Sequence, residues 1–94
     1  MKHHIIVKFK PDFKLKENLN DIKNIFNDTL KINGIYSIEY KINCIDRENR
    51  FHLMIIIDMD EVALNTYDKS NTHKLWKNKY SPYIEAKAIF DSED

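Results

Sequence analysis

The chain has 94 residues, which is enough for one domain with a single hydrophobic core. Its 15 basic and 15 acidic residues cancel, so its charge does not favour nucleic acid or an anionic membrane as a partner. We therefore expect one domain over residues 1–94 that binds neither.

Single residues narrow the possibilities further. Cys44 is the only cysteine, so no internal disulfide can form, which suits a reducing compartment. Gly34 is the only glycine, which excludes the glycine-rich loops that hold nucleotides. Met1-Lys2-His3-His4 leads straight into a predicted strand without a signal peptide, and no run approaches the roughly 20 apolar residues of a membrane helix. A cytoplasmic location is the expectation.

The first half of the chain predicts a strand, a helix and a second strand. Residues 3–10 alternate in side-chain character, as a strand does, and Pro11-Asp12 ends them. Residues 15–30 carry apolar side chains at helical spacing, which predicts an amphipathic helix over a sheet. Asn33-Gly34 should close it, with Gly34 in the left-handed conformation common at helix ends. Residues 35–42 predict the second strand.

The second half predicts a hairpin partner, two helices and a last strand. Residues 51–58 contain the longest apolar run of the chain, with three consecutive β-branched residues that favour a strand. The charged turn 46–50 should join this strand to the preceding one as a hairpin. A helix over 60–69, capped by Asp58 or Asp60, precedes a break at 70–72 and a short helix from His73 to about Lys79. Ser81-Pro82 should begin one more turn, and residues 86–90 the last strand.

This order, β-α-β-β-α-β, is that of the ferredoxin-like α+β fold, with helices on one face of a four-stranded antiparallel sheet. The central strand is apolar on both faces, and such a strand must be covered on both. The chain's own helices can cover only one. The side chains Tyr36, Ile38, Tyr40 and Ile42 form a second apolar set that also calls for cover. We therefore predict a homodimer, with a second copy on the far face.

Several short motifs follow one another along the chain. They are His3 before residues 5–10, Ile32-Asn33-Gly34-Ile35, the turn 46–50, Asp58-Met59-Asp60, Tyr67 followed by His73, and Tyr83-Ile84 with residues 88–91. Together they resemble the stress-responsive dimeric α/β-barrel family. The resemblance implies a homodimer whose two sheets close into a barrel, with a small pocket between sheet and helices in each subunit. The family includes a plant polyketide cyclase that needs no metal or cofactor, so neither is expected here.

The resemblance also names candidate catalytic residues, because His3, Tyr67 and His73 match positions that the cyclase uses. At the start of a helix, His73 should have a pKa below its free value of about 6.5 and could act as a base. Tyr67 could donate a hydrogen bond to an enolate oxygen, and His3 should lie near His73 under the helices. Since Tyr67 and His73 are six residues apart, the break between the helices is needed to turn both into one pocket.

Other positions depart from the cyclase. Its central-strand histidine aligns with Leu53, and His52 is one residue early, which should turn it toward the barrel seam. A tyrosine of the cyclase's first helix falls near Ile25. The family often has proline at Asn33 and a His-Pro pair at Ser70-Asn71. Because this polar set is incomplete, a homodimer that binds a small apolar ligand ranks first. A cofactor-free cyclase or isomerase acting on a carbonyl compound is the alternative, and a monooxygenase or haem-degrading relative is a third.

Overall fold

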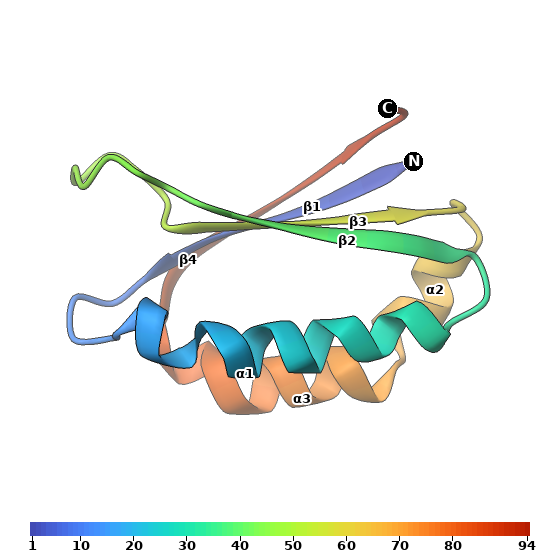
Figure 1. The fold of residues 1–94 in the computed structure, drawn as a ribbon, viewed down its shortest axis with the longest axis horizontal. Coiled ribbons are helices and arrows are strands. Elements are labelled where there is room, and N and C mark those ends of the chain that lie inside the picture. Colours follow the sequence, from blue (N-terminus) through green and yellow to red (C-terminus); the bar gives the residue numbers. More distant parts are fainter.

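The computed structural model describes all 94 residues and contains a four-stranded sheet. Helices cover one side of this sheet (Figure 1). The elements follow the predicted order; the 3-10 turn after the first helix was not predicted, whereas the one at Ser81-Pro82 was. In chain order they are β1 (Lys2–Phe9), α1 (Leu15–Asn27), a 3-10 turn (Asp28–Lys31), β2 (Ile35–Ile42), β3 (Leu53–Met59), α2 (Ala63–Asp68), α3 (Asn71–Tyr80), a 3-10 turn (Ser81–Tyr83) and β4 (Ile84–Ser92).

The strands are ordered β2-β3-β1-β4, and every neighbouring pair is antiparallel. The two central strands, β1 and β3, are far apart in the sequence and pair through six registered positions, from Lys2 opposite Asp58 to Val7 opposite Leu53. This topology confirms the predicted ferredoxin-like α+β fold. No helix is both long and apolar enough to span a membrane.

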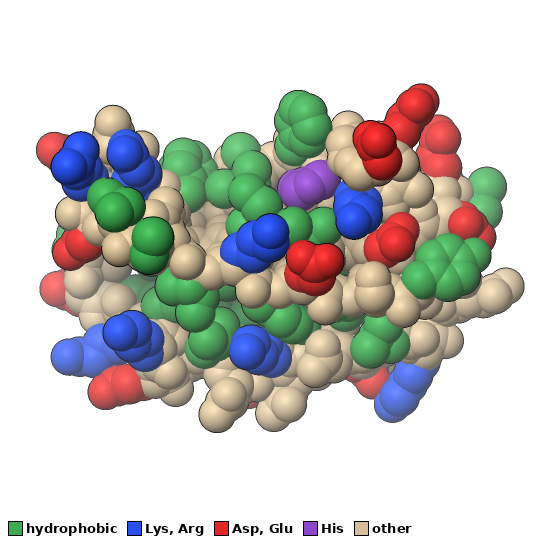
Figure 2. Space-filling model, turned by 45° about the horizontal axis from the view of Figure 1, so that its top comes forward, with side chains coloured by type: hydrophobic (Ala, Val, Ile, Leu, Met, Phe, Trp, Pro, Cys, Tyr) green, Lys and Arg blue, Asp and Glu red, His purple; other side chains and the backbone are tan.

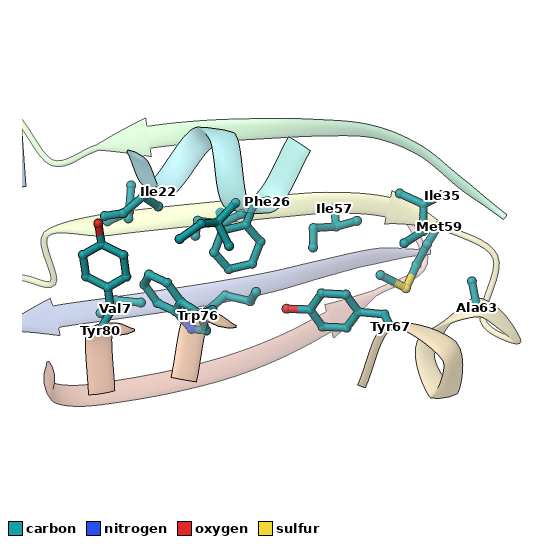
Figure 3. Close-up of a cluster of buried hydrophobic side chains, with 14 of the residues drawn as sticks. Val7, Ile22, Phe26, Ile35, Ile57, Met59, Ala63, Tyr67, Trp76 and Tyr80 are labelled. Carbon is teal, nitrogen blue, oxygen red and sulfur yellow. The ribbon is translucent and has the colours of Figure 1, made fainter. Parts of the chain in front are cut away.

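The core lies between the sheet and the helices (Figure 3). Every second residue of β1 and β3 is buried there, as strand geometry requires. Ile22 and Phe26 reach down from α1, and Trp76 and Tyr80 from α3. Trp76 packs edge-on against Phe26 with ring centroids 5.1 Å apart, so the two long helices meet each other as well as the sheet.

Strand β2 corrects one prediction. A register shift between Ile35 and Ser37 changes which side chains face the helices. Ile38 and Tyr40 pack against the core, and the single O–H of Tyr40 is shared between Asn27 Oδ1 (2.8 Å) and the Lys23 carbonyl (3.2 Å). The prediction that Tyr36, Ile38, Tyr40 and Ile42 form a set needing cover from another chain was therefore wrong, because α1 covers its two central members.

The sheet surface away from the helices remains open, and we call its apolar centre the open sheet face. Two rows of three cross-strand neighbours form it: Met54, Ile6 and Ala88 in one, and Ile56, His4 and Phe90 in the other. Figure 2 shows hydrophobic side chains gathered over this side, with charged side chains among and around them.

The helix boundaries differ from the predicted ones: the first helix ends at Asn27 rather than Leu30 and continues as a 3-10 turn, and the next two helices begin elsewhere. The second helix begins only at Ala63, and neither Asp58 nor Asp60 caps it; Asp60 Oδ2 instead accepts a hydrogen bond from the Tyr36 hydroxyl (2.7 Å). The third helix begins at Asn71 rather than His73, with Ser70 as its cap. Gly34 has the expected positive φ (+92°), in the turn that leads from the first 3-10 turn into β2.

Candidate functional site

Tyr67 is the centre of the candidate site. It comes from α2, and its side chain is buried beneath the sheet with its hydroxyl on the side of Trp76 (Figure 3). Its ring makes edge-on contacts with His3 on β1 (centroids 5.5 Å apart) and with His73 on α3 (5.3 Å). The structure therefore brings together the three residues singled out in the sequence, with the tyrosine ring between the two imidazoles.

The break between α2 and α3 brings the side chains of Tyr67 and His73 into one site, as predicted. Ser70 holds the two helix ends together. Its hydroxyl donates a hydrogen bond to the Tyr67 carbonyl (2.6 Å) and accepts one from the His73 backbone N–H (3.2 Å). One serine thus ends the tyrosine's helix and begins the histidine's helix.

His3 has a partner that sequence reasoning did not identify. It lies opposite Asp91 in the β1–β4 register, and its Nδ1 is 2.6 Å from Asp91 Oδ1. Since an ionised carboxylate can only accept, His3 donates this bond from Nδ1. In the neutral imidazole the proton then sits on Nδ1, which leaves Nε2 as the basic nitrogen. We expected His3 to lie near enough to pair with His73; instead each contacts Tyr67, and His3 is bonded to Asp91.

The surroundings set the protonation of the other two groups. Burial is the main cause that lowers the pKa of His73; nearby Lys77 and Lys87 lower it further, while Asp68 opposes the shift. The direction is the predicted one, although the prediction rested on the helix dipole. Burial also raises the pKa of Tyr67. At neutral pH the site therefore offers a neutral imidazole, able to accept a proton, beside a phenol that keeps its proton.

An open cavity of about 280 Å³ adjoins these residues, between β1, β4, α2 and α3. Its apolar wall contains Ile5, Leu64, Trp76 and Ile89 beside Tyr67, and its polar wall contains His3, His73, Asp68, Asp91, Lys77 and Lys87. The four charged residues were not predicted as part of the site. The pairing of β1 with β4 would have suggested Asp91 and Lys87, because they lie opposite His3 and Val7, but their register is not visible in the sequence.

The residues that depart from the cyclase lie outside this cavity. His52 Nδ1 accepts a hydrogen bond from the Phe9 backbone N–H (2.9 Å) at the end of β1, and its ring stacks parallel to Phe9. It borders a separate, larger hollow of about 770 Å³ beside the start of α1. Leu53 and Ile25 are buried in the core. His52 thus lies outside the site, beside Phe9, and its predicted place at the barrel seam stays a prediction.

No cluster of three or more histidine, cysteine, aspartate or glutamate side chains is arranged to hold a metal ion. The groups available for chemistry are therefore two imidazoles, a phenol, two carboxylates and two ammonium groups. They can bind an organic molecule, orient it by hydrogen bonds and exchange protons with it.

No protein-family model and no curated protein matches the sequence. Solved structures share the fold at low identity. A dimeric ferredoxin-like protein of unknown function from Bacteroides fragilis is 20% identical, with 99% of this chain and 94% of that chain covered and a TM-score of 0.71. A DABB family protein from Mesorhizobium loti is 18% identical over 99% and 94% of the two chains (TM-score 0.65). The hydroxynitrile lyase from Passiflora edulis is 13% identical over the same shares (TM-score 0.74).

Proposed function

We propose that this chain is a homodimeric ligand-binding protein of the stress-responsive dimeric α/β-barrel family, which holds a small molecule in the cavity beside His3, Tyr67 and His73. The observation that carries the proposal is the cavity itself. It lies open beside a core of 15 buried residues, and it combines an apolar wall with a few convergent polar groups, which is typical of small-molecule sites.

The open sheet face supports the homodimer. Ile6, Met54 and Ile56 alternate with the buried core residues of their strands, and the only helices of the chain lie on the opposite side. A second copy laid on this face would remove its apolar side chains from water. The similar protein from Bacteroides fragilis is described as dimeric. A cytoplasmic location belongs to the same proposal and is supported by Cys44, which is a free and exposed thiol.

A cavity-filling pair of variants tests the binding proposal. Ile89, on the edge strand, lines the cavity, whereas Leu75 on α3 is equally exposed and does not. Acetophenone, a small neutral carbonyl compound, serves as the probe in NMR titrations that follow the amide signals of the cavity residues. We expect Ile89→Trp to abolish the shifts that the wild type shows and Leu75→Trp to preserve them. Shifts that survive in Ile89→Trp, or that never occur at the cavity, would contradict the proposal.

Proton-transfer catalysis is the second candidate function, with His73 as base, Tyr67 as hydrogen-bond donor and His3 as the further imidazole. It is favoured by the contact of both imidazoles with one buried tyrosine and by the lowered pKa of His73. A structural neighbour is a hydroxynitrile lyase, so this fold can carry catalysis. Turnover of a carbonyl-bearing polyketide by the wild type that disappears in His73→Ala would support catalysis; unchanged turnover would exclude this role for His73.

A further inference from the structure

Two lysines converge on the candidate cavity from different elements. Lys77 projects from α3 and Lys87 from β4, and both line the cavity wall. Neither forms an ion pair or a side-chain hydrogen bond within the chain. Only Lys8, Lys31 and Lys79 lie within 4.0 Å of a carboxylate, so what distinguishes Lys77 and Lys87 from other unpaired lysines is their place in the cavity wall. The cavity is therefore edged by two ammonium groups whose hydrogen-bonding capacity is unused.

The same wall holds two carboxylates, equal in number to these lysines, but neither carboxylate forms an ion pair with them. Asp91 is engaged by His3, which leaves Asp68 as the remaining carboxylate against Lys77 and Lys87. After burial, the main cause, both lysines act to lower the pKa of His73 and Asp68 acts to raise it, so all three charged groups lie close enough to affect the imidazole. Lys77 and Lys87 therefore keep their ammonium donors for a ligand, and a ligand carboxylate would accept strong, charge-assisted hydrogen bonds from them.

The rest of the wall limits the size and shape of the ligand. Ile5, Leu64, Trp76 and Ile89 offer an apolar surface beside the lysines. The volume of about 280 Å³ lies just below the roughly 300–1,000 Å³ of typical ligand pockets. A compact apolar body, such as one aromatic ring, suits this space. A doubly charged group suits it less, because Asp68 and Asp91 would repel the second negative charge.

We propose that the cavity binds a small organic monoanion, a carboxylic acid with a compact apolar body, whose carboxylate pairs with the Lys77 and Lys87 ammonium groups. This inference rests on the proposed function, because it requires that the cavity binds a small molecule, and it adds the chemical class of the ligand. The apolar body lies against Trp76 and Ile89, and Tyr67 and His73 stand beside it.

A matched pair of probes tests the inference. Phenylacetate and phenylacetamide have nearly the same shape and differ in charge. Their affinities are measured by NMR titration for the wild type, for the double variant Lys77→Gln/Lys87→Gln, and for the control Lys69→Gln/Lys74→Gln. The control removes two exposed lysines of the same helical region that do not line the cavity, so the net charge changes equally.

We expect phenylacetate to bind the wild type and the control about tenfold more tightly than phenylacetamide does, the usual scale of a charge-assisted hydrogen bond. In Lys77→Gln/Lys87→Gln this preference should disappear, while the affinity for phenylacetamide is kept. Higher salt should weaken only phenylacetate binding to the wild type and the control.

The outcomes separate the two proposals. If both probes bind the cavity equally well in the wild type, or if the preference survives in Lys77→Gln/Lys87→Gln, the anion inference is overturned and the binding function stands. If the preference falls equally in the control, the effect is one of net charge, and the inference is again overturned. If neither probe shifts the cavity signals at millimolar concentration, the inference and the binding function are both contradicted.

Discussion

His73 is the residue whose chemistry depends most on its neighbours. It is partly buried, stands against the Tyr67 ring and shares its cavity with two lysines. Its usefulness as a base requires that it be neutral near pH 7, which burial and the lysines favour. The same lysines would pair with a bound carboxylate, so occupation of the cavity should reduce their effect on the imidazole. The proposed carboxylate ligand should therefore couple its binding to the basicity of His73.

Replacing Lys77 tests the electrostatic part of this coupling. The pKa of His73 should rise in Lys77→Gln, because the repulsion of the imidazolium by the lysine is removed, and it should stay unchanged in Lys74→Gln. Proton NMR of the histidine ring across a pH titration measures both. In the wild type the pKa of His73 in the folded state lies below its unfolded value of about 6.5. Between these two pKa values the unfolded state therefore binds more protons than the folded state does. The His73 contribution therefore leaves stability highest above about pH 6.5 and lowers it as pH falls toward the folded pKa. An unchanged His73 pKa in Lys77→Gln would contradict this account.

At the scale of elements, the site depends on how two helices meet. The hydroxyl of Ser70 bonds both the last turn of α2 and the first turn of α3, so it sets the angle at which Tyr67 and His73 enter the cavity. A serine in this position is a common helix cap, and its loss usually costs about 1 kcal/mol.

Ser70→Ala should lower the free energy of unfolding by about 1 kcal/mol, because it leaves the His73 N–H without its partner. It should also shift the NMR signals of the His73 ring. Urea unfolding followed by tryptophan fluorescence measures the stability, with Trp76 as the only tryptophan. Ser70→Thr keeps a hydroxyl and should restore most of the loss, whereas equal losses in both variants would show that the cap is unimportant.

The elements themselves could largely be predicted, because β1 and β3 alternate and α1 has a helical apolar stripe, all of which are local patterns. The face of β2 could not, since one bulge near Tyr36 reverses the alternation and carries Ile38 and Tyr40 to the helix side. The cavity was predicted in part. His3, Tyr67 and His73 came from the family resemblance, but the bond from His3 to Asp91 joins residues 88 positions apart, and it depends on a strand register that no local pattern encodes.

At the scale of the whole molecule, the two faces of the sheet have different roles. The helix side holds the core and the candidate cavity, and the open sheet face holds partly exposed apolar side chains on three adjacent strands. With the error in β2 removed, the dimer proposal rests on β1, β3 and β4 alone. Glu39 and Lys41 flank the patch on β2, which places charge at its rim, as is common in protein interfaces.

A charge placed at the centre of the open sheet face tests the dimer. Ile56→Glu should separate the subunits, because association would bury an unpaired carboxylate, while each monomer keeps its core and its circular dichroism spectrum. Val62→Glu introduces the same charge at a residue that is 82% exposed and lies off this face, so it should leave the dimer intact.

Sedimentation velocity at micromolar concentration distinguishes dimer from monomer for each variant. The wild type and Val62→Glu should sediment as dimers, with Ile56→Glu as a monomer. A monomeric wild type would show that water, and not a second copy, covers the face; a dimeric Ile56→Glu would place the interface elsewhere. Because the cavity lies on the helix side of each subunit, Ile56→Glu should still bind acetophenone, which separates assembly from binding.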